Sequence, residues 1–312
     1  MKKLLLVLIF IAVSSPNKAY AGYEDGMNAL RNSDHELALA IFLPLAREGN
    51  ANAQYNVGLL FQQGRGIKQN YKKASQWYLA AANQGHFAAQ NNIGSLYRRG
   101  KGVGQNYKSA VYWYQRARQD SPLARNNLAF LYINGFGLEK NSASAVRLLK
   151  WASGSGHVKS IFDLGKLYEM GHGVKKNKKK AAEMYKLAAH KNYPQAMYQM
   201  GLLHEKGIMF KRNLKAAAEW HLQAAKKNYA SAQVRIGSMY MDGLGVAKNY
   251  QEAHHWFILA SRKGHPLANH ALGLIYEKGL GVKSDPDQAN LYFLLAKENN
   301  YKNNEVRQIL NQ

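Results

Sequence analysis

Residues 53–82, AQYNVGLLFQQGRGIKQNYKKASQWYLAAA, decide the fold, because the same pattern is repeated seven times along the chain. Its first half places Val57 before Gly58, an aromatic at Phe61, and then Gly64 and Gly66. The Gly58 position recurs at steps of 36, 35, 36, 36, 36 and 36 residues, at Gly58, Gly94, Ala129, Gly165, Gly201, Gly237 and Gly273. Such a period predicts a solenoid, in which each unit is too small to bury its own apolar face and packs on its neighbours.

The first half of each copy has the spacing of a helix. Counted from the Gly58 position as zero, a small residue stands at −5 and apolar residues stand at −1, +2 and +3, which places one apolar stripe along a helix. Glycine follows at +6 in all seven copies, where it predicts a left-handed helix cap. A second glycine follows at +8 in every copy except the fifth, which has Met209 there.

The second half of each copy predicts another helix. Position +12 carries a residue that is favoured as an N-cap: Asn70, Asn106, Asn141, Asn177, Asn213, Asn249 and Asp285. Alanine at +16, a bulky residue at +19 and alanine at +23 again give spacings of three and four. Each unit is therefore expected to be helix, Gly-rich turn, helix and short turn. The sequence predicts an all-α, right-handed solenoid of about seven such units.

The ends of the chain depart from the repeat. Residues 1–21 combine Lys2 and Lys3, a short apolar run and Ala19-Tyr20-Ala21, which predicts a signal peptide cleaved after Ala21. We expect residues 22–50 to form an N-terminal capping half repeat, residues 51–301 the seven repeats, and residues 302–312 a C-terminal capping helix. No later stretch is long and apolar enough for a transmembrane segment. The predicted location is periplasmic or secreted.

The composition narrows the classes of partner and chemistry. The chain has no cysteine, which excludes disulfides, thiolate metal sites and an N-terminal lipid anchor. Its net charge is +24, and residues 158–229 hold 15 basic and 5 acidic residues. An exported protein is not expected to meet nucleic acid, so the excess fits either a solvated surface or an anionic lipid, glycan, peptidoglycan or acidic protein.

No pattern typical of an enzyme is present. The Gly-rich stretches recur seven times and are expected to be turns, and no P-loop or zinc-protease motif occurs. The 19 acids fall mostly at varying repeat positions, and the 11 histidines show no metal-ligand spacing. We expect no catalytic residues, no metal site and no cofactor.

The first helices of stacked pairs line one face, where we expect a groove for a partner polypeptide. Position −2 begins with three asparagines, whose amides both donate and accept hydrogen bonds and suit an extended peptide backbone. Arg98 and Arg99 lie near this ladder in the sequence and suit a carboxylate. The candidate groove residues are Asn56, Asn92, Asn127, Arg98, Arg99, Asp163, Gln199 and Arg235. The alternative is a polar face that only contacts solvent.

A second candidate surface is the lysine patch, which we define as Lys175, Lys176, Lys178, Lys179 and Lys180. These residues surround the predicted N-cap Asn177, where the helix dipole disfavours positive charge. We expect the patch either to bind an anionic glycan or lipid headgroups, or to keep the protein soluble.

The repeat resembles a known family. The series Ala53, Val57, Gly58, Phe61, Gly64, Gly66 and Ile67, followed by Ala74, Trp77, Tyr78, Ala81 and Ala82, is similar to the Sel1-like repeat, a relative of the tetratricopeptide repeat. The resemblance covers about residues 51–301. It implies a non-enzymatic scaffold or adaptor for protein partners in the bacterial envelope, in envelope assembly, signalling, host interaction or virulence. Binding of peptidoglycan or another anionic glycan is the alternative function.

Overall fold

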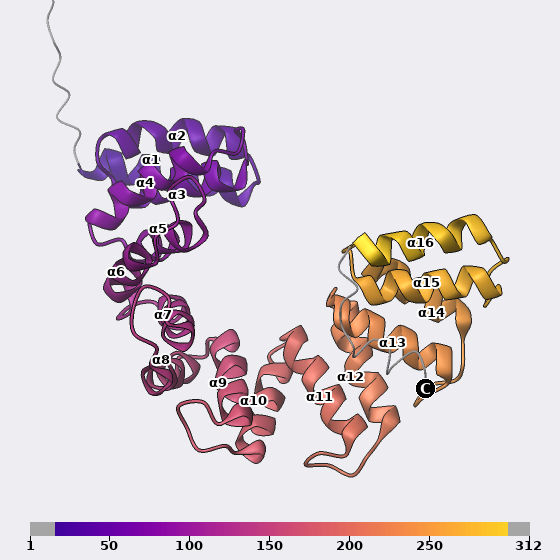
Figure 1. The fold of residues 1–312 in the computed structure, drawn as a ribbon. Helices are drawn as coiled ribbons and strands as arrows, with labels where there is room; N and C mark the ends of the chain where they lie inside the picture. Colours follow the sequence, from indigo (N-terminus) through magenta and orange to yellow (C-terminus); the bar gives the residue numbers. More distant parts are fainter. Residues whose placement is uncertain (1–15, 299–312) are drawn as a thin grey trace, which may run out of the picture. The chain divides into compact units, whose positions relative to one another are not determined.

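The computed structural model describes residues 16–298, of which residues 16–21 are described by their backbone only. These residues form 16 α-helices and no strand (Figure 1). The helices are α1 (Pro16–Arg31), α2 (His35–Arg47), α3 (Ala51–Gln63), α4 (Tyr71–Asn83), α5 (Phe87–Arg99), α6 (Tyr107–Ala117), α7 (Pro122–Asn134), α8 (Ser142–Gly154), α9 (Val158–Met170), α10 (Lys178–His190), α11 (Pro194–Lys206), α12 (Leu214–Lys226), α13 (Ala230–Asp242), α14 (Tyr250–Ser261), α15 (Pro266–Lys278) and α16 (Pro286–Glu298).

The chain divides into two compact units, residues 1–148 and 149–312, called unit 1 and unit 2 below. In unit 1, α3 pairs with α4 and α5 pairs with α6, and each pair packs on the next. In unit 2, α9 pairs with α10, and the same arrangement continues to the pair of α15 and α16. The prediction of an all-α solenoid of helix pairs is confirmed. The odd-numbered member of each repeat from α3 onward is called the first helix, and the even-numbered member the second helix.

The two kinds of helix cap predicted from the sequence are confirmed in all seven repeats. The glycine that follows each first helix has a left-handed φ between 65° and 78°: Gly64, Gly100, Gly135, Gly171, Gly207, Gly243 and Gly279. The side chain at +12 accepts a hydrogen bond from the backbone N–H three residues later, at 2.8 to 3.0 Å, in each second helix. These caps satisfy backbone groups that a helix end leaves without partners.

In five repeats the second glycine of the turn contacts the start of the even-numbered helix that precedes it. A Cβ atom built on Gly102 would lie 2.2 Å from the Tyr71 carbonyl oxygen at the start of α4. Corresponding overlaps with the preceding second helix occur at Gly66, Gly137, Gly245 and Gly281. The position therefore requires glycine both for its positive φ and for close backbone approach. The fifth copy has methionine instead of glycine at this position. Met209 keeps the left-handed conformation, with a φ of 68°, and its side chain is 45% exposed.

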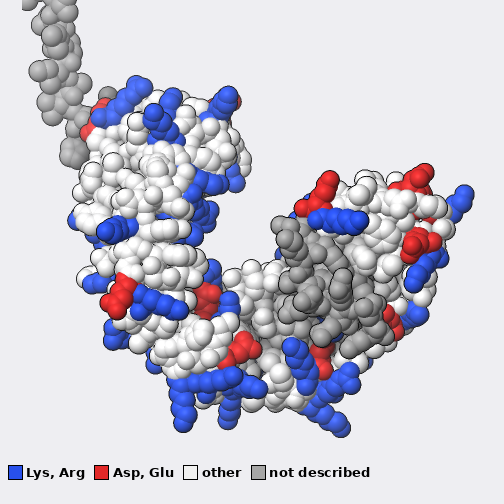
Figure 2. Space-filling model, viewed as in Figure 1, with Lys and Arg blue, Asp and Glu red and all other residues white. Residues whose placement is uncertain are grey.

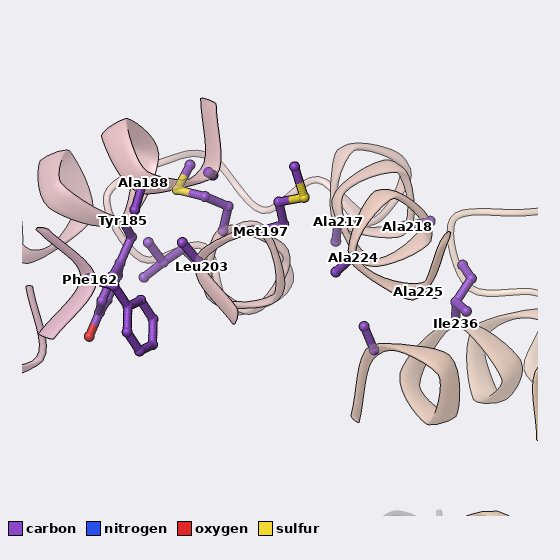
Figure 3. Packing of buried hydrophobic residues seen from close by; sticks show 14 of the residues in the cluster. Phe162, Tyr185, Ala188, Met197, Leu203, Ala217, Ala218, Ala224, Ala225 and Ile236 are labelled. Atoms are coloured by element: carbon purple, nitrogen blue, oxygen red, sulfur yellow. The ribbon is translucent and has the colours of Figure 1, made fainter. Parts of the chain in front are cut away.

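The core lies between the paired helices of each repeat. The glycine or alanine at position zero faces a large side chain of the second helix, as Gly58 faces Tyr78 and Gly165 faces Tyr185. A Cβ atom on Gly58 would lie 2.7 Å from the Tyr78 ring, so the small residue allows the two helices to approach closely. Figure 3 shows part of the unit 2 core, where Phe162, Tyr185, Met197 and Leu203 pack with the alanines of α10 and α12.

The N-terminal region contains more structure than the predicted half repeat at 22–50. A further helix, α1, precedes α2 and packs on it, and a Cβ atom on Gly26 would lie 2.5 Å from the Phe42 ring. Gly26 and Phe42 therefore reproduce the glycine–aromatic contact of the repeats. The prediction for 22–50 named only the second of these two helices. The pair lacks the Gly-x-Gly turn by which the repeats were found, so the repeat pattern did not reveal α1.

Two predicted segments fall largely or wholly on residues that the structure does not describe. The proposed signal peptide, 1–21, is described only in its last six residues, and the proposed C-terminal capping helix, 302–312, lies outside the described residues. Within residues 16–298, no helix combines the length and the hydropathy that membrane spanning requires.

Candidate functional site on the first-helix faces

The predicted groove residues lie on first helices in both units. Asn56, Asn92, Asn127, Arg98 and Arg99 belong to unit 1, whereas Asp163, Gln199 and Arg235 belong to unit 2. The two sets are therefore described separately, and one continuous groove across them remains a prediction.

The asparagines of unit 1 are partly joined by hydrogen bonds. The Asn127 side-chain amide on α7 donates to the Asn91 carbonyl oxygen on α5 at 2.9 Å, and the Asn91 amide donates to Asn92 at 3.3 Å. Asn91 is buried, whereas Asn92 and Asn127 are half-exposed. Because an amide carries two N–H groups and a carbonyl oxygen with two lone pairs, these bonds leave hydrogen-bonding capacity on Asn127 and on the Asn92 carbonyl oxygen. We call these three residues the asparagine chain.

Asn56 does not belong to this chain, and its predicted place in an open groove is wrong. Its side chain is buried against α1, where its amide donates to the Tyr23 hydroxyl at 3.1 Å. The same contact explains why the ladder cannot continue: the additional helix α1 covers the first of the three asparagines.

Two tyrosines lie beside the asparagine chain. Burial raises the pKa of the Tyr55 hydroxyl on α3 and of the Tyr78 hydroxyl on α4, and the Asn92 amide opposes part of each increase. Both hydroxyls therefore stay protonated at neutral pH; Tyr55 is half-buried, whereas Tyr78 is buried. The Tyr55 ring also stacks on His86, with ring centroids 4.6 Å apart.

Arg98 and Arg99 extend the unit 1 site toward the end of α5. The Arg98 guanidinium lies over the Phe130 ring of α7 at 5.4 Å, and Phe130 is 40% exposed. Arg99 is exposed at the last turn of the helix. The site thus combines amides, an aromatic ring and two cations, a composition that suits a peptide with polar, apolar and acidic groups.

The groove residues of unit 2 are used mainly in contacts within the unit. The Arg235 guanidinium on α13 donates two hydrogen bonds to the Glu205 carboxylate on α11, one of them at 2.8 Å from Nε. The His221 ring on α12 lies 2.7 Å from the same carboxylate. Asp163 pairs with Lys159 at 2.6 Å, and Gln199 is half-exposed. Arg235 and Asp163 are therefore held by internal partners.

The cluster of Glu205, His221 and Arg235 controls the charge of its carboxyl group. Burial alone would raise the pKa of Glu205, but hydrogen bonds from His221 and Arg235 outweigh burial and lower this pKa to about 2. The side chains of Glu205 and His221 are 8% and 0% exposed, so they are not open to a substrate. The geometry indicates a structural ion pair that joins two repeats.

Sequence reasoning missed Asn91, Phe130 and the Glu205–His221 contact. The contact joins position +4 to position +20 of the same repeat, and Glu169 and Tyr185 repeat it, with the Tyr185 hydroxyl donating to the carboxylate at 2.7 Å. A covarying acid and donor at these two positions is the signal that could have revealed it. Asn91 and Phe130 stand at −3 and +1, which the helix pattern alone did not separate from core and solvent positions.

No metal centre is built by the part of the chain that the structure describes, since no group of three or more His, Cys, Asp and Glu side chains could hold an ion there.

The lysine patch lies in the turn before α10 and in the first turn of that helix. All five lysines are exposed, and the Asn177 side chain caps α10 by accepting from the Lys180 backbone N–H at 2.9 Å. Figure 2 shows blue side chains projecting from the lower edge of the region that holds α9 to α12.

Comparison with known proteins places the repeat in a family. The Sel1 repeat matches seven consecutive stretches: residues 51–86, 87–120, 122–157, 158–193, 194–229, 230–265 and 266–301. Among solved structures, a Sel1 repeat protein from Oxalobacter formigenes is 29% identical, with a TM-score of 0.72 over 80% of this chain and 99% of that one. A protective antigen of uropathogenic Escherichia coli with an SLR fold is also 29% identical, with a TM-score of 0.68 over 83% of this chain.

These similarities differ in how much of the relative they cover. The chain spans 56% of the length of the Escherichia coli antigen. A curated relative, the ERAD-associated E3 ubiquitin-protein ligase component HRD3A of Arabidopsis thaliana, is 36% identical over 70 residues, which are 22% of this chain and 10% of the plant protein. The similarity to the plant protein therefore concerns a short run of repeats.

Proposed function

Because this chain belongs to the Sel1 repeat family, whose members generally mediate protein–protein interaction, we propose that it is an adaptor that binds an extended polypeptide on the first-helix face of unit 1. The asparagine chain is the observation that carries this proposal. Its half-exposed amides, Asn92 and Asn127, offer donors and acceptors to a peptide backbone, and Arg98 and Arg99 offer cations to an acidic side chain or a carboxyl terminus.

We propose further that the adaptor acts in the bacterial envelope, either in the periplasm or after secretion. The proposal rests on the signal-peptide pattern of residues 1–21. The similarity to a protective antigen of uropathogenic Escherichia coli is in keeping with a role in host interaction, beside envelope assembly and signalling. The family is typically a non-enzymatic scaffold, and a scaffold role requires no catalytic group.

The test compares capture of partner proteins from envelope extract by the unaltered chain and by the double variant Asn92→Ala with Asn127→Ala. The proposal expects a specific partner to be retained by the first and lost by the second. The control is Asn83→Ala with Gln115→Ala, which removes two exposed amides from second helices and should retain the partner. Equal capture by all three proteins would contradict the proposed site.

Binding must be separated from folding in this test, because Asn127→Ala also removes the hydrogen bond to buried Asn91. The expected stability loss is about 1 kcal/mol, the usual contribution of one such bond. Far-UV circular dichroism should show unchanged helix content in both double variants. If the captured material is cell-wall or glycan rather than protein, the alternative of an anionic-glycan-binding module replaces the adaptor.

A further inference from the structure

We propose that unit 2 docks on an anionic membrane surface through its turn edge, with Met209 entering the boundary between headgroups and acyl chains. The turn edge is defined as residues 171–180 and 207–216, which are the Gly-rich turns of repeats four and five and the first residues of α10 and α12. This inference goes beyond the adaptor function, since none of the unit 1 site residues takes part in it.

The turn edge is the most positively charged pair of consecutive turn segments in the chain. Its two segments contain eight cations and no acid: Lys175, Lys176, Lys178, Lys179, Lys180, Lys211, Arg212 and Lys215. All eight side chains are exposed. The corresponding segments of repeats one and two, 64–73 and 100–109, hold six cations and no acid. Those of repeats six and seven, 243–252 and 279–288, have net charges of 0 and −1. The positive charge is therefore not a requirement of the repeat, and it complements a surface of anionic lipid headgroups.

Met209 supplies an apolar group within this charged edge. It holds the left-handed φ of 68° where the other six repeats have glycine, and its side chain is 45% exposed. A non-glycine residue in this conformation is strained, and such strain is concentrated at functional positions. An unbranched thioether next to lysines suits the boundary of a lipid bilayer, where apolar burial and attraction to headgroups act together.

Met209 lies two residues before Lys211 and three before Arg212 in the turn of the fifth repeat. In five other repeats the corresponding glycine contacts the first residues of the preceding second helix, as Gly245 contacts Leu214 and Lys215. By the same relation, we expect the turn that holds Met209 to lie beside the start of α10, which begins with Lys178 and Lys179. The neighbouring Phe210 ring stacks on His204 at 4.6 Å between centroids and steadies the turn. An anionic polysaccharide would use the lysines but would leave Met209 without a role.

The first experiment measures partitioning of the full chain onto vesicles of phosphatidylcholine alone and vesicles in which roughly a third of the lipid is phosphatidylglycerol. We expect binding to the anionic vesicles only. Lys211→Gln with Arg212→Gln should lower the partition coefficient about 25-fold, at about fivefold for each charge near the surface. The control, Lys226→Gln with Lys227→Gln, removes the same charge from the other end of α12 and should lower it far less.

The second experiment tests the insertion of the side chain at position 209. Because the chain has no cysteine, Met209→Cys can be labelled uniquely with an environment-sensitive nitrobenzoxadiazole dye. The matched control is Leu187→Cys, whose parent side chain on α10 is 44% exposed, against 45% for Met209. Anionic vesicles should shift the emission of the dye at 209 to the blue and leave the dye at 187 unchanged.

Several results of these two experiments would overturn the proposal. They are equal binding to neutral and anionic vesicles, equal losses in the two double-glutamine variants, and an unshifted dye at position 209 on bound protein. Retention on purified peptidoglycan without vesicle binding would also overturn it and would assign the turn edge to a glycan. Far-UV circular dichroism of each variant establishes that the repeats remain folded, so that lost binding reports on the surface.

Discussion

At the scale of single residues, the second glycine of each turn has two separate requirements. Gly102 has a φ of 71°, and any side chain would also overlap the Tyr71 carbonyl at the start of α4. Gly85, in the turn between repeats, has a φ of 91° but no atom within 4 Å of a Cβ position. The two glycines therefore allow conformational strain and steric overlap to be measured separately.

We expect Gly85→Ala to lower the free energy of unfolding by about 1 kcal/mol, the strain of a left-handed residue. Gly102→Ala should lower it by about 3 kcal/mol or more, because backbone overlap is added to the same strain. Urea unfolding followed by circular dichroism measures both values. Equal losses in the two variants would show that the contact with α4 does not constrain the turn.

The sequence predicted the conformation of these turns but not their contacts. A glycine after an apolar helical stripe indicates a left-handed cap from local chemistry alone. The overlap of Gly102 with Tyr71 joins residues 31 positions apart and belonging to different repeats. Such a contact depends on how the repeats stack, and the repeat pattern does not specify that geometry.

Glu205 gives the molecule a predictable acid sensitivity. The pKa of Glu205 is about 2 in the folded chain, against an ordinary value of 4.5 for this carboxyl group. The contribution of Glu205 to stability is therefore present above pH 4.5 and is lost as the pH falls toward 2. The loss is expected to be on the order of 3 kcal/mol. Glu205→Gln should be less stable at neutral pH and should lose less stability between about pH 4.5 and 2.

Urea unfolding at several pH values provides this measurement. The control is Glu183→Gln on the exposed side of α10, which should follow the unaltered chain across the same pH range. If the stability of Glu205→Gln falls as steeply as that of the unaltered chain, the ion pair with Arg235 is not the source of the acid sensitivity.

At the scale of helices, the contacts of position −2 could not be predicted from the repeat pattern. The helical pattern led us to expect this position to face an open groove, but such a pattern does not reveal which neighbouring helix approaches it. Asn56 contacts Tyr23 on α1, Asn127 contacts Asn91 on α5, and Arg235 contacts Glu205 on α11. In these three repeats the position −2 side chain reaches back to a preceding first helix or to α1. In these repeats the polar residue at position −2 contacts a neighbouring helix, and this contact limits its capacity to bind a ligand.

The N-terminus of α10 should be improved by a single change of charge. Its first turn contains Lys178, Lys179 and Lys180 and no acid, although the helix dipole favours negative charge there. Lys179→Glu should raise the free energy of unfolding by about 0.5 kcal/mol at low ionic strength, and less in high salt. Thermal unfolding at two salt concentrations measures this difference.

The matched comparison is Lys186→Glu, which makes the same charge change in the middle of α10. It isolates the dipole from the general relief of positive charge on the molecule. An equal gain in the two variants would mean that the cost arises from net charge rather than from the helix terminus.

At the scale of the whole molecule, the contacts run between neighbouring elements. The helix pairs of each unit pack on adjacent pairs, so stability should be distributed locally along the stack. Ile93→Ala, which opens a cavity at a fully buried position of α5, should increase amide exchange in α3 to α7. Exchange in α13 to α16 should stay unchanged. Hydrogen exchange with mass spectrometry of peptides locates the effect, and a uniform increase would indicate one cooperative unit.

The sequence predicted this architecture well because each of the seven copies independently supports the helix assignment made for the others. It did not predict the division at residues 148 and 149, which separates Asn127 from Asp163. Regular spacing of polar residues at position −2 is therefore not sufficient evidence that they form one binding site. The asparagine chain, which lies within unit 1, is the part that contacts support.

The backward contact of each turn has a consequence for synthesis. Gly66, Gly102, Gly137, Gly245 and Gly281 all fit against residues that precede them in the chain. A ribosome releases the chain from its N-terminus, so the surface that receives each turn has been made before the turn itself. Each new repeat can therefore pack on residues that have already been synthesised. The stack can fold from the N-terminus during translation, before the C-terminal repeats are made.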